Sequence, residues 1–146
     1  MERKVVLTVD GLVTLAHQEI VLIRRAKPPF MDRLVMPGGH VEASDVSMPA
    51  ACARELEEEI GCRVHPDDLQ LLCVLDRPDA DPRPGQRVSL VYTINFPDPF
   101  VFATFVAATD ARELVRCSLW SVTAEDLGFD HFEAILALRQ RLAAAL

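Results

Sequence analysis

The sequence has no long apolar run and no excess of positive charge, and each absence excludes a class of protein. No apolar stretch approaches the roughly 20 residues that span a membrane, and the start MERKVVLTVDG lacks the apolar stretch and cleavage site of a signal peptide. A net charge of -7 argues against a general binder of nucleic acid or anionic membranes, because such proteins neutralise phosphates with a basic face. We therefore expect a cytoplasmic protein without nucleic-acid or membrane partners.

The chain also lacks CxxC spacing, Gly/Ser-rich linkers and internal repeats. Its four cysteines do not form the framework of a short secreted protein, so we interpret them as reduced, mostly buried thiols. Half of the 146 residues are hydrophobic, which is enough for an ordinary core. These features predict one domain over residues 1–146.

Apolar and β-branched runs predict a chain dominated by strands. KVVLTV and LVTL read as two strands with a break at Asp10–Gly11, and EIVLIRR reads as a third. LQLLCVLD and RVSLVYTINF predict further strands on either side of a proline-rich loop. FVFATFVA is another strand candidate, followed by SLWSV.

Two helices are expected, one early and one late. Ser47 is a good N-cap for a helix over residues 50–60, and Gly61 is a natural C-cap. The second helix starts near Asp130, where DHFE has the pattern of a capping box with Glu133 at its third position. The order of elements predicts an α+β fold, an α/β/α sandwich with a mixed sheet in one domain.

The early helix carries Glu55, Glu57, Glu58 and Glu59 within five positions. At about 100° per residue, Glu57 points away while the other three share a face, with Arg54 placed to bind Glu58. One interpretation is a solvated acidic face. The other is a site for a hard divalent cation such as Mg²⁺, which prefers carboxylate oxygens. The glycine-rich stretch PGGHVE before the helix favours the second interpretation.

The segment GGHVEASDVSMPAACARELEEEIGC resembles the Nudix hydrolase signature, G-x5-E-x7-R-E-U-x-E-E-x-G-U, where U is a bulky aliphatic residue. Three departures are visible. Asp45 stands where the signature has its first Glu, eight residues rather than seven separate it from Arg54, and Cys62 replaces the last aliphatic residue. The residues in register are Gly39, Arg54, Glu55, Leu56, Glu58, Glu59 and Gly61.

The resemblance implies a Nudix-like fold and metal-dependent hydrolysis of a nucleoside diphosphate linked to another moiety. By resemblance, Glu55, Glu58 and Glu59 bind Mg²⁺, with Mn²⁺ as an alternative, and the Gly39 carbonyl is a further ligand. Arg54 is implied to orient Glu58, although a plain surface ion pair would give the same spacing. Glu55 is also one candidate for the general base, together with Asp110 and Glu113 on a later loop.

Features along nearly the whole chain are similar to the ADP-ribose pyrophosphatase branch of that family. They include VLIRRAKPPF before the signature, Pro78 at 16 residues after Cys62, and DADPRPGQRVSLVYTI. Leu34 takes the place of an aromatic residue in this branch, so recognition of the base is expected to differ.

Substrate contacts are expected from Arg25 and Arg83, which suit phosphate, and from the backbone of Gly38 and Gly39. Surface arginines without a ligand are the alternative for the first two. His40 is a further candidate for the pocket, whereas Phe129 and His131 are expected to position the last helix.

The leading hypothesis is hydrolysis of ADP-ribose to AMP and ribose 5-phosphate. One alternative is a pyrophosphatase for damaged or surplus nucleoside triphosphates. Another is a sensor domain that binds ADP-ribose without turnover. Resemblance to the branch also implies a homodimer that completes the pocket across its interface.

Overall fold

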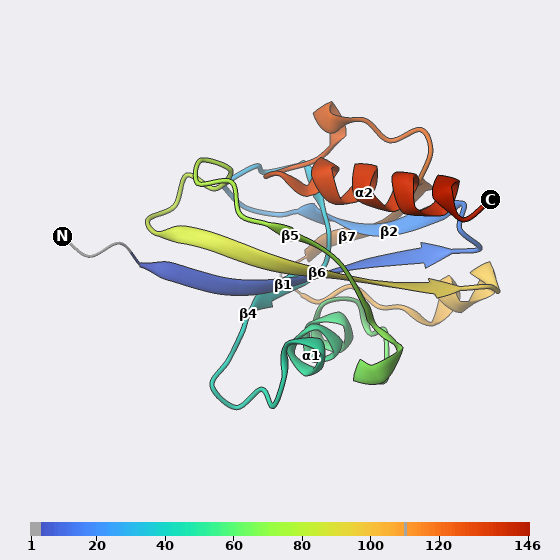
Figure 1. The fold of residues 1–146 in the computed structure, drawn as a ribbon, viewed down its shortest axis with the longest axis horizontal. Coiled ribbons are helices and arrows are strands. Elements are labelled where there is room, and N and C mark those ends of the chain that lie inside the picture. Colours follow the sequence, from blue (N-terminus) through green and yellow to red (C-terminus); the bar gives the residue numbers. More distant parts are fainter. Residues whose placement is uncertain (1–3, 110) are drawn as a thin grey trace.

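The computed structural model describes residues 4–109 and 111–146 and contains a mixed sheet between two helices (Figure 1). The helices are α1 (Met48–Ile60) and α2 (His131–Ala144), and they cover opposite faces of the sheet. The predicted α+β fold, an α/β/α sandwich, is confirmed. The strands are β1 (Val5–Leu15), β2 (Glu19–Arg25), β3 (Leu34–Val35), β4 (Gly38–His40), β5 (Gln70–Leu75), β6 (Gln86–Phe96) and β7 (Ala111–Ser118).

Strand β1 lies at the centre of the sheet, whose order is β3-β2-β1-β6-β5, with β4 paired to β1 and β7 paired to β2. It runs parallel to β6 along its whole length, while its other edge is shared between two antiparallel partners. Residues 8–10 pair with β4 and residues 13–15 pair with β2. Between them, the Gly11 amide donates to the Pro37 carbonyl at 2.9 Å. The predicted break at Asp10–Gly11 is therefore wrong: the strand continues, and its partner changes there.

Gly11 is explained by the helix above it. A Cβ on this residue would lie 2.6 Å from Cδ2 of Leu56, which is fully buried on α1. Val9 and Val13 belong to the core on the α1 side of the sheet, and Leu12 belongs to the core on the α2 side. Because both faces are covered, β1 reads as a nearly continuous apolar run, and glycine marks the close approach of α1.

The predicted caps of α1 are confirmed. Ser47 Oγ accepts a hydrogen bond from the Ala50 amide at 3.1 Å, and Gly61 adopts a left-handed φ of 67° after the last turn. At α2 the predicted capping box is wrong. Asp130 is the N-cap residue, but its side chain makes no cap hydrogen bond, and Glu133 forms an ion pair with Arg77 instead.

The strand expected over FVFATFVA is also wrong, because residues Pro99–Thr104 form a 3-10 turn. Asp98 caps this turn by accepting from the Phe100 amide, and proline occupies its first position. Phe102 and Phe105 then pack edge to face at 6.0 Å between ring centroids and cover the core on the α1 side. The strand that follows is β7, and SLWSV begins at its last residue.

All four cysteine thiols are free in the structure, and the predicted burial holds fully for two of them. Cys52 and Cys62 are buried, and Cys73 and Cys117 are partly buried. Within residues 4–109 and 111–146, no helix has the length and apolar character needed to span a membrane.

Candidate active site

The guanidinium of Arg54 joins three segments of the chain at the start of the site. Its Nε and Nη2 lie 2.9 Å from the two carboxylate oxygens of Asp45, and Nη2 also donates to the His40 carbonyl at 3.1 Å. Its Nη1 lies 2.9 Å from Glu55 Oε1 and 3.1 Å from Glu58 Oε2. The expected Arg54–Glu58 pair is therefore present. Hydrogen bonds to Asp45 raise the pKa of Arg54, and the Glu55 carboxylate raises it further.

Asp45 makes the two-pronged contact with Arg54 although the signature spacing is one residue longer here. Its side chain is 5% exposed, and Oδ2 also accepts from the Glu42 amide at 2.7 Å. Hydrogen bonds from Arg54 and from that amide lower the pKa of Asp45 to about 2. The loop between β4 and α1 thus accommodates the extra residue, and the shorter acid still reaches the guanidinium.

Glu55 lies against the backbone of β4. Its carboxylate is buried, and burial raises its pKa while the hydrogen bond and charge of Arg54 oppose the rise. A Cβ on Gly39 would lie 2.6 Å from Glu55 Oε1. Only glycine leaves room for this approach, so the glycine-rich stretch does fold back onto the acidic helix as expected.

The carboxylates on α1 have the chemistry of a site for a hard cation. Glu55 and Glu58 already share one cationic group, Arg54 Nη1, whereas Glu57 faces elsewhere and pairs with Arg63 at 3.2 Å. An all-oxygen donor set of this kind fits Mg²⁺ or Mn²⁺. Among the described residues, however, no three His, Cys, Asp or Glu side chains are arranged to hold a metal. Ligation by Glu55, Glu58 and Glu59 stays a prediction.

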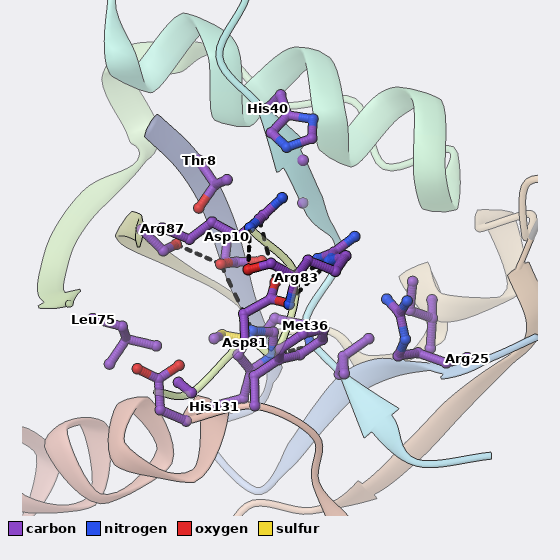
Figure 2. A pocket seen from close by; sticks show the side chains of 18 of the residues that line it. Thr8, Asp10, Arg25, Met36, His40, Leu75, Asp81, Arg83, Arg87 and His131 are labelled. Atoms are coloured by element: carbon purple, nitrogen blue, oxygen red, sulfur yellow. Dashed lines mark hydrogen bonds and ion pairs between the residues drawn. The ribbon is translucent and has the colours of Figure 1, made fainter. Parts of the chain in front are cut away.

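A pocket opens beside this helix and continues across β4 to the start of α2 (Figure 2). Its lining contains all four predicted substrate contacts, which are Arg25, Arg83, Gly38 and Gly39. Glu59, His40 and Pro78 also line it, whereas Glu55 and Glu58 do not. Leu34, noted for replacing an aromatic residue, is buried in the core on the α2 side.

Two arginines face one aromatic ring in this pocket: Arg25 at the end of β2 and Arg83 in the loop between β5 and β6. The guanidinium carbons of Arg25 and Arg83 lie 5.1 and 5.7 Å from the centroid of Phe129. Burial lowers the pKa of Arg25, and the nearby charge of Arg83 lowers it further. Arg83 is held by Asp81, with Nη2 and Oδ2 2.6 Å apart. This part of the pocket therefore combines concentrated positive charge with an aromatic face.

Arg87 is a pocket residue that the sequence reasoning missed. Its Nε lies 3.3 Å from Asp81 Oδ2, yet this buried nitrogen has no hydrogen-bond partner among the described residues. Burial acts to raise the pKa of Asp81. The hydrogen bonds from Arg83 and the charges of Arg83 and Arg87 act against burial, and the pKa of Asp81 is lowered overall. The available signal was an arginine next to the proline-rich loop, at the start of a strand with alternating apolar residues.

A second missed group, Asp10, Ser89 and His131, lies where β1 changes partners. Ser89 Oγ donates to Asp10 Oδ2 in a short hydrogen bond, and His131 Nε2 lies 3.8 Å from the same oxygen. His131 Nδ1 accepts from the Met36 amide at 3.0 Å, so the ring carries its proton on Nε2. Burial raises the pKa of Asp10, although His131 and Ser89 oppose the rise. An acid inside the apolar run VVLTVDGLVTL was the signal for this group.

The remaining expectations have mixed outcomes. Phe129 and His131 stand at the start of α2 as expected, but both also line the pocket. Glu113 is not on a loop: it lies in β7, where it pairs with Arg24 at 2.6 Å. Asp110 lies outside the described residues.

With this geometry established, comparison with known proteins identifies the family. The model of the NUDIX domain matches residues 4–135. The chain belongs to the Nudix family. It is 33% identical over 127 residues to an ADP-ribose pyrophosphatase of Methanocaldococcus jannaschii, covering 87% of this chain and 69% of that protein.

Two solved structures that resemble the fold carry bound nucleotides. The NUDIX domain of Shewanella oneidensis NrtR, complexed with ADP-ribose, is 26% identical with a TM-score of 0.80, covering 97% of this chain and 90% of that one. A bifunctional NMN adenylyltransferase/ADP-ribose pyrophosphatase of Francisella tularensis, complexed with AMP and a Mn ion, is 27% identical with a TM-score of 0.77. The alignment covers 96% of this Nudix chain but only 42% of the Francisella protein.

Proposed function

We propose that this Nudix pyrophosphohydrolase cleaves the diphosphate of ADP-ribose to give AMP and ribose 5-phosphate. Nudix enzymes use a divalent metal, and here Glu55, Glu58 and Glu59 on α1, with the Gly39 carbonyl, would hold it. The bound cation would neutralise the diphosphate and activate the attacking water. Water adds to one phosphorus while the bridging P–O bond breaks.

The observation that carries this proposal is the joint lining of one pocket by Glu59, Gly39, Arg25 and Arg83. The acidic helix and the two arginines come from distant parts of the sequence, yet they border the same space. A diphosphate beside the carboxylates would lie within reach of Arg25, whose pKa is lowered first by burial and then by the repulsive charge of Arg83. An anion there would relieve that repulsion. Arg54 would act by positioning Glu55 and Glu58.

The similarity to an ADP-ribose pyrophosphatase and to an ADP-ribose-bound NUDIX domain supports this substrate. Because that NUDIX domain is complexed with ADP-ribose, binding of ADP-ribose without turnover stays an alternative function. A triphosphate pyrophosphatase is the remaining alternative within the family. The homodimer implied by the sequence stays a prediction.

A substrate panel separates these functions. The purified protein is incubated in Mg²⁺ with ADP-ribose or with each nucleoside triphosphate, and the products are separated by chromatography. We expect equal amounts of AMP and ribose 5-phosphate from ADP-ribose, and no release after the metal is chelated. Calorimetric binding of ADP-ribose without release would instead support the sensor, and release of pyrophosphate from triphosphates alone would support the second enzyme.

A further inference from the structure

We propose that Asp10 is a specificity-determining residue that accepts hydrogen bonds from the hydroxyl groups of a ribose in the substrate. The inference rests on the proposed function, because ADP-ribose is the ligand that brings riboses to this pocket. It starts from an arrangement that packing alone does not require. A buried carboxylate with no lysine or arginine partner among the described residues costs free energy, and this one borders the pocket.

The three members of the group come from three elements and converge on one oxygen. Asp10, Ser89 and His131 are each less than 9% exposed, and both partners contact Oδ2 of the carboxylate. The Met36 amide occupies His131 Nδ1, so the ring can present a hydrogen only from Nε2 toward Asp10. These contacts fix the position of the carboxylate before any ligand arrives.

The other oxygen lies at the wall formed by β4. A Cβ on Gly38 would collide with Asp10 Oδ1 and with the Val9 carbonyl. Glycine at this position therefore leaves room for the Asp10 carboxylate beside β4, next to the residues that border the pocket. Figure 2 shows Asp10 near the middle of the lining, among Thr8, Arg83 and Arg87.

The chemistry of this region favours a neutral group that donates hydrogen bonds. Asp10 and Asp130 both line it, and the nearby Arg83 and Arg87 are already paired with Asp81, so the two acids disfavour a phosphate at the same place. Thr8 and Ser89 are opposite each other on β1 and β6, so small hydroxyl-bearing side chains border the carboxylate. The ring of Phe129, which suits a base, lies near Arg25 and Arg83, and its centroid is 5.4 Å from that of the His131 ring.

A ribose diol fits these requirements. Its two adjacent hydroxyl groups are donors that one carboxylate can accept, and acidic side chains bind ribose hydroxyls in this way in dinucleotide sites. ADP-ribose contains two riboses, one in the adenosine and one at the far end. The chemistry of the diol is the same in both, so the experiment has one arm for each.

The test uses the reaction products, which are not hydrolysed and so do not depend on turnover. Affinities in Mg²⁺ are measured by calorimetry for AMP against 2′-deoxy-AMP, and for ribose 5-phosphate against 2-deoxyribose 5-phosphate. We expect wild type to prefer the ribose form in at least one pair by about 10- to 100-fold, the range for hydrogen bonds to a charged group. Asp10→Ala should abolish that preference, and the pair affected identifies which ribose Asp10 holds.

Two further variants serve as a conservative comparison and as a control. Asp10→Asn has nearly the same shape as the native side chain, so it provides the comparison if Asp10→Ala does not fold; it should reduce the preference. Thr93→Ala removes a buried hydroxyl on β6 that bonds the Leu12 carbonyl at 2.8 Å outside the pocket, and it should keep the preference.

Several results would overturn the inference. They are a wild type that binds no product or shows no preference in either pair, and a folded Asp10 variant that keeps the full preference. Equal loss of AMP and 2′-deoxy-AMP binding would assign Asp10 to the base or phosphate instead. Failure to hydrolyse ADP-ribose is measured separately and would count against the proposed function alone.

Discussion

At the scale of single residues, Arg54 shows how one side chain can organise several acids. Its planar guanidinium binds Asp45 with two nitrogens and leaves the third to join Glu55 and Glu58. This geometry needs arginine, because a lysine ammonium has no rigid fork. The pairing of Arg54 with Glu58 could be predicted from their spacing of four. The contact with Asp45 could not, because it depends on how the loop before α1 closes.

The lowered pKa of Asp45 predicts a specific acid sensitivity. A carboxyl whose pKa falls from 3.8 to about 2 on folding stabilises the folded state above pH 3.8, and this contribution is lost as the pH falls toward 2. Asp45→Asn removes the titrating group. We expect the difference in unfolding free energy between wild type and this variant, measured by urea denaturation, to shrink from pH 5 to pH 2.

Asp67→Asn is the matched control, since its carboxylate is 90% exposed and its only described ion pair is with His65. This variant should track wild type more closely through the same range. A constant difference between wild type and Asp45→Asn at every pH would contradict the assigned role of Asp45.

At the scale of elements, the acidic helix is held over the sheet by the match between Leu56 and Gly11. The caps at Ser47 and Gly61 make the limits of α1 predictable from sequence, because they depend on local chemistry. The position at which α1 packs on the sheet depends on contacts between residues far apart in the sequence, so it could not be predicted in the same way. Gly11 suggested a break in the strand, and only the packed structure reveals that it accommodates a leucine side chain.

A double-mutant cycle tests this docking. Gly11→Ala should destabilise the protein by about 1–3 kcal/mol, the usual cost of overpacking a core, because its Cβ would meet Leu56 Cδ2. Leu56→Val should also destabilise, by leaving a small void. Combined, the two changes should cost at least about 0.5 kcal/mol less than their sum, because the smaller side chain makes room for the methyl group. Strict additivity in urea denaturation would contradict the account.

At the scale of the whole molecule, features that depend on neighbouring residues in the sequence could be predicted. Contacts that the sheet creates between distant parts of the chain could not. The acidic helix, its caps and two arginines of the pocket, Arg25 and Arg83, were visible in the sequence. Asp10 and Arg87 were missed because only the pairing of β1 with β6 brings them to one pocket, whereas the sequence placed Asp10 at an expected break and Arg87 at the start of an expected strand. The turn at Pro99–Thr104 was misread because its aromatic residues resemble a strand, whereas Asp98 and proline start a 3-10 turn.

The measurement that tests the central claim most directly is the rate of ADP-ribose hydrolysis in Mg²⁺ by wild type, Glu58→Gln/Glu59→Gln and Glu57→Gln. Glu57 is the matched control, because it belongs to the same acidic run but lies on another face of α1, where it pairs with Arg63. We predict that Glu57→Gln stays close to wild type and that the double variant loses more than about 100-fold, as expected when metal ligands are removed. Equal activity in the two variants would contradict a metal site on this helix.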